Sequence, residues 1–105
     1  MIDIDDFKKI ELKTAEVLKA EKVDGSDKLL KLTIKIGDEQ RTIVAGIAKY
    51  YGSEIEGKTI IVVTNLKPRN LKGIESQGML LAASDDSNLA ILTTDKPVKS
   101  GLLIK

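Results

Sequence analysis

Apolar and polar residues alternate strictly from Leu30 to Ile36, and this pattern constrains the fold more than any other in the chain. A period of two is typical of a half-buried β-strand. Gly37–Gln40 follows as a turn, and Arg41–Val44 is the expected hairpin partner. Thr59–Thr64 consists of β-branched residues, which predicts a strand buried on both faces. Further apolar runs lie at residues 78–83 and 89–93. Short strands at this spacing favour an all-β barrel or sandwich.

The segment Leu12–Val23 does not fit this pattern clearly. It is rich in Leu, Ala, Glu and Lys, which are good helix formers, so local propensity leaves helix and strand both open. Short helical turns are expected at Asp5–Ile10, where Asp5 can cap, and at Ile47–Tyr51. Ser26 and Asp27 suit a turn or cap before the strand that begins at Leu30.

The chain of 105 residues contains neither cysteine nor histidine. That composition removes zinc fingers, thiol nucleophiles, Ser-His-Asp triads and imidazole bases together. The acidic pairs Asp5-Asp6 and Asp85-Asp86 lie in helix-start or turn contexts, where Asp is expected to bond the backbone. We therefore expect one domain, with no enzyme activity, no cofactor and no metal. The acidic N-terminus has no apolar signal core, and no apolar run is long enough for a membrane, so a cytoplasmic location is expected.

The stretch Asn65–Met79 is the most informative candidate site, and the sequence predicts it as a long connection between two apolar strands. Lys67, Arg69 and Lys72 project three cations against one anion, Glu75. Cations on a loop held by Pro68 and Gly73 would suit phosphates, although a solvated surface loop has the same charge pattern. Net charge is only +1 and aromatic residues are scarce. An RNA partner would then be recognised by shape and backbone rather than by a stacking platform.

These residues also resemble a known family. The motifs are Asn65-Leu66-Lys67-Pro68, Leu71-Lys72-Gly73-Ile74 and residues 76–83 (SQGMLLAA), with further matches at residues 7–12, 27–29 and 41–47. Together they are similar to the tRNA-binding domain at the C-terminus of many methionyl-tRNA synthetases. The same domain occurs in free-standing tRNA-binding proteins, in endothelial-monocyte-activating polypeptide II and in some tyrosyl-tRNA synthetases. Val23–Asp27 departs from the family, which often has His-Pro-Asn-Ala-Asp there, and this weakens any contact assigned to that turn.

The resemblance implies a single domain over residues 1–105 with an oligonucleotide-binding (OB) fold. This is a five-stranded Greek-key barrel with short helical segments and a C-terminal extension. In that fold Leu12–Val23 is a long, bent first strand. The family typically dimerises through segments outside the barrel, here including residues 96–105. It binds tRNA by its folded shape.

Carried over residue by residue, the resemblance implies tRNA contacts at Lys28, Arg41, Asn65, Lys67, Arg69, Lys72, Ser76 and Met79. The three cations of the Asn65–Met79 stretch would meet phosphates, and Asn65 and Ser76 would hydrogen-bond the RNA backbone or brace the loop. Met79 would pack on a base or belong to the core. The implied partners are tRNA, a second copy of the chain and a synthetase catalytic chain. A related export-chaperone family, which shares the fold and binds proteins, is the alternative.

Overall fold

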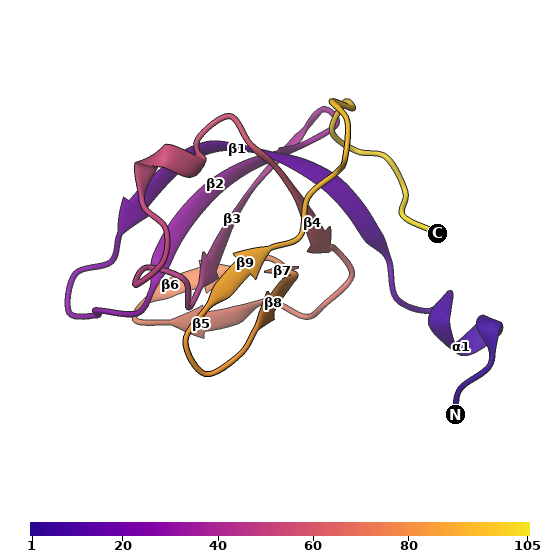
Figure 1. Ribbon diagram of the computed structural model, residues 1–105, viewed down its shortest axis with the longest axis horizontal. Coiled ribbons are helices and arrows are strands. Elements are labelled where there is room, and N and C mark those ends of the chain that lie inside the picture. Colours follow the sequence, from indigo (N-terminus) through magenta and orange to yellow (C-terminus); the bar gives the residue numbers. More distant parts are fainter.

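The computed structural model describes residues 1–105, and nearly all of its regular structure is β. Figure 1 shows a strongly curved sheet with a short helix projecting at the N-terminus. The elements are α1 (Ile4–Phe7), β1 (Leu12–Lys22), β2 (Leu30–Ile36), β3 (Glu39–Ala45), a 3₁₀ turn (Ser53–Ile55), β4 (Thr59–Val63), β5 (Arg69–Leu71), β6 (Ile74–Ser76), β7 (Met79–Leu80), β8 (Ala82–Ser84) and β9 (Leu89–Ile91). The all-β class predicted from the sequence is confirmed.

The main sheet has five strands in the order β3-β2-β1-β4-β7. β2 and β3 form the predicted hairpin, with Ile36 opposite Glu39 across the turn. In β4, residues 60–63 are all buried, as the β-branched run predicted. The main core is formed largely by side chains from one face of this sheet. It consists of Ala15, Val17, Leu30, Leu32, Ile34, Ile36, Ile43, Ile47, Ile55, Ile60, Val62 and Leu80.

The segment that left helix and strand open is strand β1, which runs the length of the molecule (Figure 1). Its first half pairs with β4 and its second half with β2, and the register shifts between Val17 and Lys19. Such a bulge bends a strand, so one strand serves both parts of the sheet. Burial of Ala15 and Val17 on the core face outweighs the helix propensity of the segment.

The C-terminal segment covers the edge of β1 that β2 leaves free. The backbone N–H of Thr14 donates to the carbonyl of Leu102 at 2.9 Å, and the N–H of Ile104 donates to the carbonyl of Leu12 at 2.8 Å. The buried hydroxyl of Thr14 donates to the Lys99 carbonyl at 2.9 Å. Residues 96–105, expected as an extension, are therefore fastened to the sheet at several points.

Three local expectations need correction. The N-terminal helix spans Ile4–Phe7 and is capped by Asp3 rather than Asp5, because the Asp3 carboxylate accepts the N–H of Asp6 at 2.9 Å. The run 78–83 contains two strands: β7 pairs with β4, and β8 pairs with β9. The Asn65–Met79 connection is structured and contains the hairpin β5–β6. Ile47–Tyr51 forms the predicted helical turn, in which Ile47 accepts the N–H of Tyr51 at 2.9 Å. No helix is long and apolar enough to cross a membrane.

Candidate nucleic-acid interface

The basic stretch is built around the β5–β6 hairpin, in which Leu71 lies opposite Ile74 and Lys72-Gly73 forms the two-residue turn. Both turn residues have positive φ, 53° for Lys72 and 81° for Gly73. This is the backbone of a tight hairpin turn whose twist matches that of the strands. The side chain of Asn70 accepts the N–H of Gly73 at 3.0 Å and fixes the turn further.

The three cations of the hairpin region carry no ion pair. Lys67, Arg69 and Lys72 are exposed, and none takes part in any of the four salt bridges of the molecule. Their charge is therefore available to an anionic partner, and Glu75 does not neutralise it through contact.

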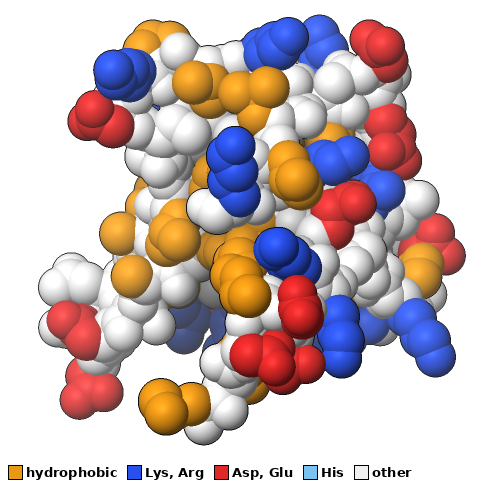
Figure 2. Space-filling model, turned by 90° about the vertical axis from the view of Figure 1, so that its right-hand side faces the viewer, with side chains coloured by type: hydrophobic (Ala, Val, Ile, Leu, Met, Phe, Trp, Pro, Cys, Tyr) orange, Lys and Arg blue, Asp and Glu red, His pale blue; other side chains and the backbone are white.

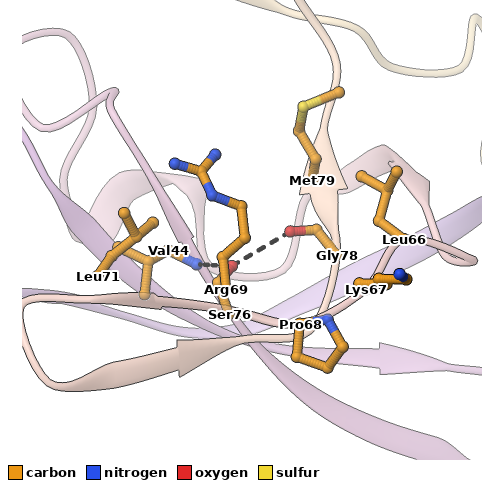
Figure 3. Close-up of a pocket in the computed structure, with 9 residues that line it drawn as sticks. All are labelled: Val44, Leu66, Lys67, Pro68, Arg69, Leu71, Ser76, Gly78 and Met79. Carbon is orange, nitrogen blue, oxygen red and sulfur yellow. Dashed lines mark hydrogen bonds between the residues drawn. The ribbon is translucent and has the colours of Figure 1, made fainter.

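Ser76 is the last residue of β6; it is buried in the protein interior and only 5% exposed. Its hydroxyl oxygen accepts the N–H of Val44 at 2.9 Å and donates to the carbonyl of Gly78 at 3.2 Å (Figure 3). Both hydrogen-bonding roles of the hydroxyl are thus used inside the protein. Of the two roles expected for Ser76, the structure supports the brace.

Gln77 and Gly78 continue this connection between the two edges of the main sheet. Gln77 donates its N–H to the Thr42 carbonyl at 2.9 Å and accepts the Thr42 N–H on its side-chain oxygen at 3.2 Å. Gly78 has φ +146°, and a Cβ there would lie 3.0 Å from the Val63 carbonyl oxygen. Only glycine fits this close passage without displacement. The free edge of β3 is therefore bonded by the backbone and side chain of Gln77 and by the side chain of Ser76 rather than by a further strand.

Asn65 braces the other end of the stretch. Its amide nitrogen donates to the Lys9 carbonyl at 2.8 Å, and its side-chain oxygen accepts the Glu11 N–H at 2.9 Å. The entry to the hairpin is thereby tied to the segment between α1 and β1. Both polar atoms of Asn65 are engaged in the fold.

Arg41, also expected at the site, is engaged in the fold as well. Its guanidinium pairs with Glu39 at 2.8 Å and donates to the carbonyls of Thr64 at 2.7 Å and Gln77 at 3.2 Å. The Arg41 hydrogen bond lowers the pKa of Glu39 below its ordinary value. Arg41 thus holds the strand ends from which the hairpin departs.

Lys28 lies on a different loop, with its side chain exposed. Ser26 forms the expected turn here, because its hydroxyl accepts the N–H groups of Lys28 and Leu29 at 3.2 Å and 3.1 Å. The Lys28 carbonyl accepts the Ala48 N–H at 2.9 Å. Lys28 lines neither of the cavities beside the hairpin, although its neighbour Leu29 does.

Met79 is 49% exposed, while the next residue, Leu80, is buried. The alternation of β7 therefore turns Met79 outward, away from the core. It borders a cavity of about 420 Å³ whose other walls are Val44, Leu66, Lys67, Pro68, Arg69, Leu71, Ser76 and Gly78. Figure 3 shows the Arg69 and Met79 side chains on the same side of this cavity. The exposed Leu66 and Pro68 also line this cavity but were not predicted as site residues. Their position as apolar residues inside a polar connection could have indicated it.

The site offers cations and apolar surface but no catalytic constellation. No group of three or more His, Cys, Asp or Glu side chains is placed to hold a metal. Exposed, unpaired cations beside a largely apolar cavity can bind a polyanion. Small all-β modules that present cations in this way are common among nucleic-acid-binding domains.

The family model described as "Putative tRNA binding domain" matches residues 12–102, and the chain belongs to this family. The methionine–tRNA ligase of Caldanaerobacter subterraneus is 58% identical over 101 residues, which cover 95% of this chain and 16% of that protein. A methionyl-tRNA synthetase-related protein of Pyrococcus horikoshii superposes with a TM-score of 0.93 at 41% identity, covering 100% of this chain and 98% of that one. The CsaA chaperone of Picrophilus torridus gives 0.91 at 28% identity over the whole of both chains. The resemblance drawn from the motifs is confirmed.

Proposed function

We infer that the chain is a non-catalytic module that binds tRNA largely independently of its sequence, through the shape and phosphates of the folded RNA. One observation carries this proposal: Arg69 and Lys72 on the β5–β6 hairpin, and Lys67 just before it, are exposed without a carboxylate partner on a stretch that is braced at both ends. Because the backbone that carries these cations is braced, less conformational entropy is lost when they meet phosphates. Because only Tyr50 among the aromatic residues is exposed, a row of stacked single-stranded bases has no platform.

The fold that we propose for this function is the Greek-key OB barrel. In support, the sheet is strongly curved and its edge strand β3 is joined to the segment before β7 through Ser76 and Gln77. In OB folds, loops that leave the barrel engage the nucleic acid. The β5–β6 hairpin leaves the sheet between β4 and β7 and would serve as that element.

The role that we propose is that of an affinity appendage of methionyl-tRNA synthetase in the cytoplasm, either within that chain or beside it. The chain spans 16% of the length of the curated relatives, which are methionine–tRNA ligases. A module that holds the body of the tRNA raises the effective concentration of its reactive end near a separate active site. No catalytic group is needed in the module itself.

The chain would act as a homodimer through the face that carries both termini. An apolar groove of about 490 Å³ lies between α1 and the C-terminal segment and includes Ile4, Phe7, Ile10, Leu103 and Ile104. Ile4 and Leu103 are 62% and 61% exposed. Figure 2 looks onto this side of the molecule, where hydrophobic side chains are scattered across the face among lysines, arginines and carboxylates. Sedimentation of the protein at micromolar concentration tests the dimer, and a clean monomer contradicts it.

The experiment that tests tRNA binding is a salt series with tRNA and a plain RNA duplex. For three phosphate contacts per protomer, log K should fall against log[salt] with a slope of about −3. The variant Lys67→Ala/Arg69→Ala/Lys72→Asn should bind weakly, with a slope near zero. Equal affinity for tRNA and the duplex, or binding that salt does not affect, contradicts the proposal.

A matched control removes the same net charge elsewhere. The lysines Lys19, Lys35 and Lys58 are exposed and line neither cavity beside the hairpin. Their triple Ala variant should keep the affinity for tRNA within about threefold and most of the salt slope. A loss equal to that of the hairpin variant would assign the binding to overall charge instead.

A second candidate function is peptide binding, as in the CsaA chaperones that the chain resembles. The observation that favours it is a largely apolar groove of about 560 Å³, which includes Leu29, Ile47, Leu71, Leu81 and Leu89. Replacing Lys67 and Lys72, which do not line this groove, would leave peptide binding intact, whereas it would weaken tRNA binding.

A further inference from the structure

The cavity beside the hairpin has more apolar surface than phosphate binding requires. Leu66 and Met79 are 46% and 49% exposed. Both lie beside residues that are bonded into the fold: Asn65 precedes Leu66, and Leu80 of β7 follows Met79. Met79 pairs with Val63 through the backbone in the β4–β7 ladder, so its outward direction is set by the strand. Exposed apolar side chains held in place beside unpaired cations suggest a ligand with both an apolar and an anionic part.

The floor of the cavity offers little for hydrogen bonding. Val44 is buried, and the Ser76 hydroxyl already accepts from the Val44 N–H and donates to the Gly78 carbonyl. A ligand on this floor would therefore be held by contact rather than by its hydrogen-bonding edge. Contact of this kind tolerates any of the four nucleobases, because each presents a flat π face.

The charges at the cavity mouth have one sign. Lys67 and Arg69 line it, and no Asp or Glu lines this cavity or the groove beside it, with which it shares Val44, Arg69, Leu71 and Met79. A guanidinium plane can stack on a base and still reach a phosphate. Charge complementarity thus favours a nucleotide over a neutral apolar segment.

A peptide would also lack the backbone bonds that usually hold it beside a sheet. The nearby edge strand β3 has its Thr42 and Val44 N–H groups bonded to the side chains of Gln77 and Ser76. Strand addition needs those groups free. The edge is therefore closed to an extended chain, while a single flat group can still enter the cavity.

We propose that this cavity takes one unstacked nucleobase of the bound tRNA, packed between Met79 and Leu66, while Lys67 and Arg69 hold the flanking phosphates. This rests on the proposed function and names the part of the RNA that the site receives. The base is held through its faces, so binding favours RNA with an accessible base and is indifferent to which base it is.

Two properties of the chain make the test direct. The chain has no tryptophan, so Leu66→Trp introduces a single reporter at the cavity wall. Leu18→Trp is the matched control, because Leu18 is an exposed residue of β1 that lines none of the cavities at the hairpin. The probes are tRNA, inorganic polyphosphate, which has the charge of a nucleic acid but no base, and a denatured apolar protein, which tests peptide binding.

With tRNA, the emission of the Leu66→Trp protein should fall by about half or more, and that of the Leu18→Trp protein should not change. Polyphosphate should displace tRNA and leave both emissions unchanged. Met79→Ala should weaken tRNA binding about fivefold with the salt slope preserved, and Met79→Leu should restore most of the affinity.

Three outcomes would overturn the base-binding proposal. One is that tRNA binds at full affinity while the Leu66→Trp emission does not change, or that Met79→Ala binds tRNA as tightly as the parent protein does. Another is quenching by polyphosphate equal to that by tRNA. The third is an emission change with a denatured apolar protein but not with tRNA, which would assign the cavity to peptides. In the first two outcomes salt-dependent tRNA binding survives; its complete absence would refute the proposed function itself.

Discussion

The side chain of Ser76 takes the place of a backbone partner for Val44, whose N–H it accepts at 2.9 Å in the protein interior. Val44 lies on the edge strand β3, and Ser76 ends the hairpin that carries the basic residues. One hydroxyl therefore joins the edge of the sheet to the binding element. The same atom donates to the Gly78 carbonyl and so supports the turn into β7.

Ser76→Ala should lower the free energy of unfolding by about 1–3 kcal/mol, because it leaves the Val44 N–H buried without an acceptor. Urea unfolding followed by circular dichroism measures the loss. Ser53→Ala is the matched control, since the Ser53 side chain is exposed and makes no hydrogen bond in the structure; it should change stability by less than about 0.5 kcal/mol. Equal stability of the two variants would show that the Ser76 brace has no energetic role.

Asn65→Ala tests whether this residue braces the hairpin or contacts RNA. Because both of its polar atoms bond the Lys9–Glu11 backbone, we expect unfolding free energy to fall by about 1–2 kcal/mol and tRNA affinity to fall with it. The salt slope of binding should remain that of the parent, since no cation is lost. A weakened affinity with unchanged stability would instead identify Asn65 as a direct RNA contact.

Lys72 can be separated from the turn that it occupies. At φ 53° a lysine is strained, whereas asparagine tolerates the left-handed region, so Lys72→Asn should preserve or raise the stability of the protein. Its affinity for tRNA should fall, and the slope of log K against log[salt] should become less negative by about one. Urea unfolding and a binding salt series measure the two effects. Gly73→Val keeps the charge but forces a β-branched residue into φ 81°, so it should lower the stability of the protein and leave the salt slope of tRNA binding unchanged.

Stability should fall at acid pH through two glutamates. The Thr64 hydroxyl, followed by the charge of Lys13, lowers the pKa of Glu11, and the Arg41 hydrogen bond lowers that of Glu39. A carboxyl whose folded pKa lies below its unfolded value stabilises the fold above the unfolded pKa, and that stability is lost as pH falls through the folded pKa. Both contributions should therefore be present near pH 7 and disappear below the ordinary glutamate pKa of 4.5.

Thermal unfolding between neutral pH and about pH 3 measures this loss. Glu11→Gln and Glu39→Gln should each give a shallower decline than the parent because they remove one titrating group. Glu75→Gln is the control: this side chain makes no ion pair or hydrogen bond in the structure, and its decline should match that of the parent. A parent-like decline in both test variants would exclude these two carboxylates as the cause.

Periodicity in the sequence predicted the parts of the fold that depend on local pattern. The alternation of Leu30–Ile36 and the β-branched run of β4 both became strands of the core sheet. Propensity alone could not decide Leu12–Val23, since the burial of Ala15 and Val17 comes from strands that follow it in the chain. The strand assignment came from the family resemblance.

The site was predicted in its charges but not in its architecture. Lys67, Arg69 and Lys72 were identified as the cations of the candidate site, while the hairpin that carries Arg69 and Lys72 was expected as a loop. The Lys72-Gly73 turn was the local signal, but the short, polar flanking strands gave no alternation to support it. The braces join residues 32 and more positions apart in sequence, such as Val44 to Ser76 and Glu11 to Asn65, and no local pattern encodes them.

The braces at Asn65 and at Ser76–Gly78 have a consequence for how this domain can evolve. They hold both ends of residues 66–75, in which only the Asn70 side chain makes a hydrogen bond, to the Gly73 N–H of the turn. The residues between the two braces can therefore be substituted together while the sheet retains its contacts. One scaffold can in this way acquire a new ligand through substitutions within a few neighbouring codons, and the same route is open to protein engineering.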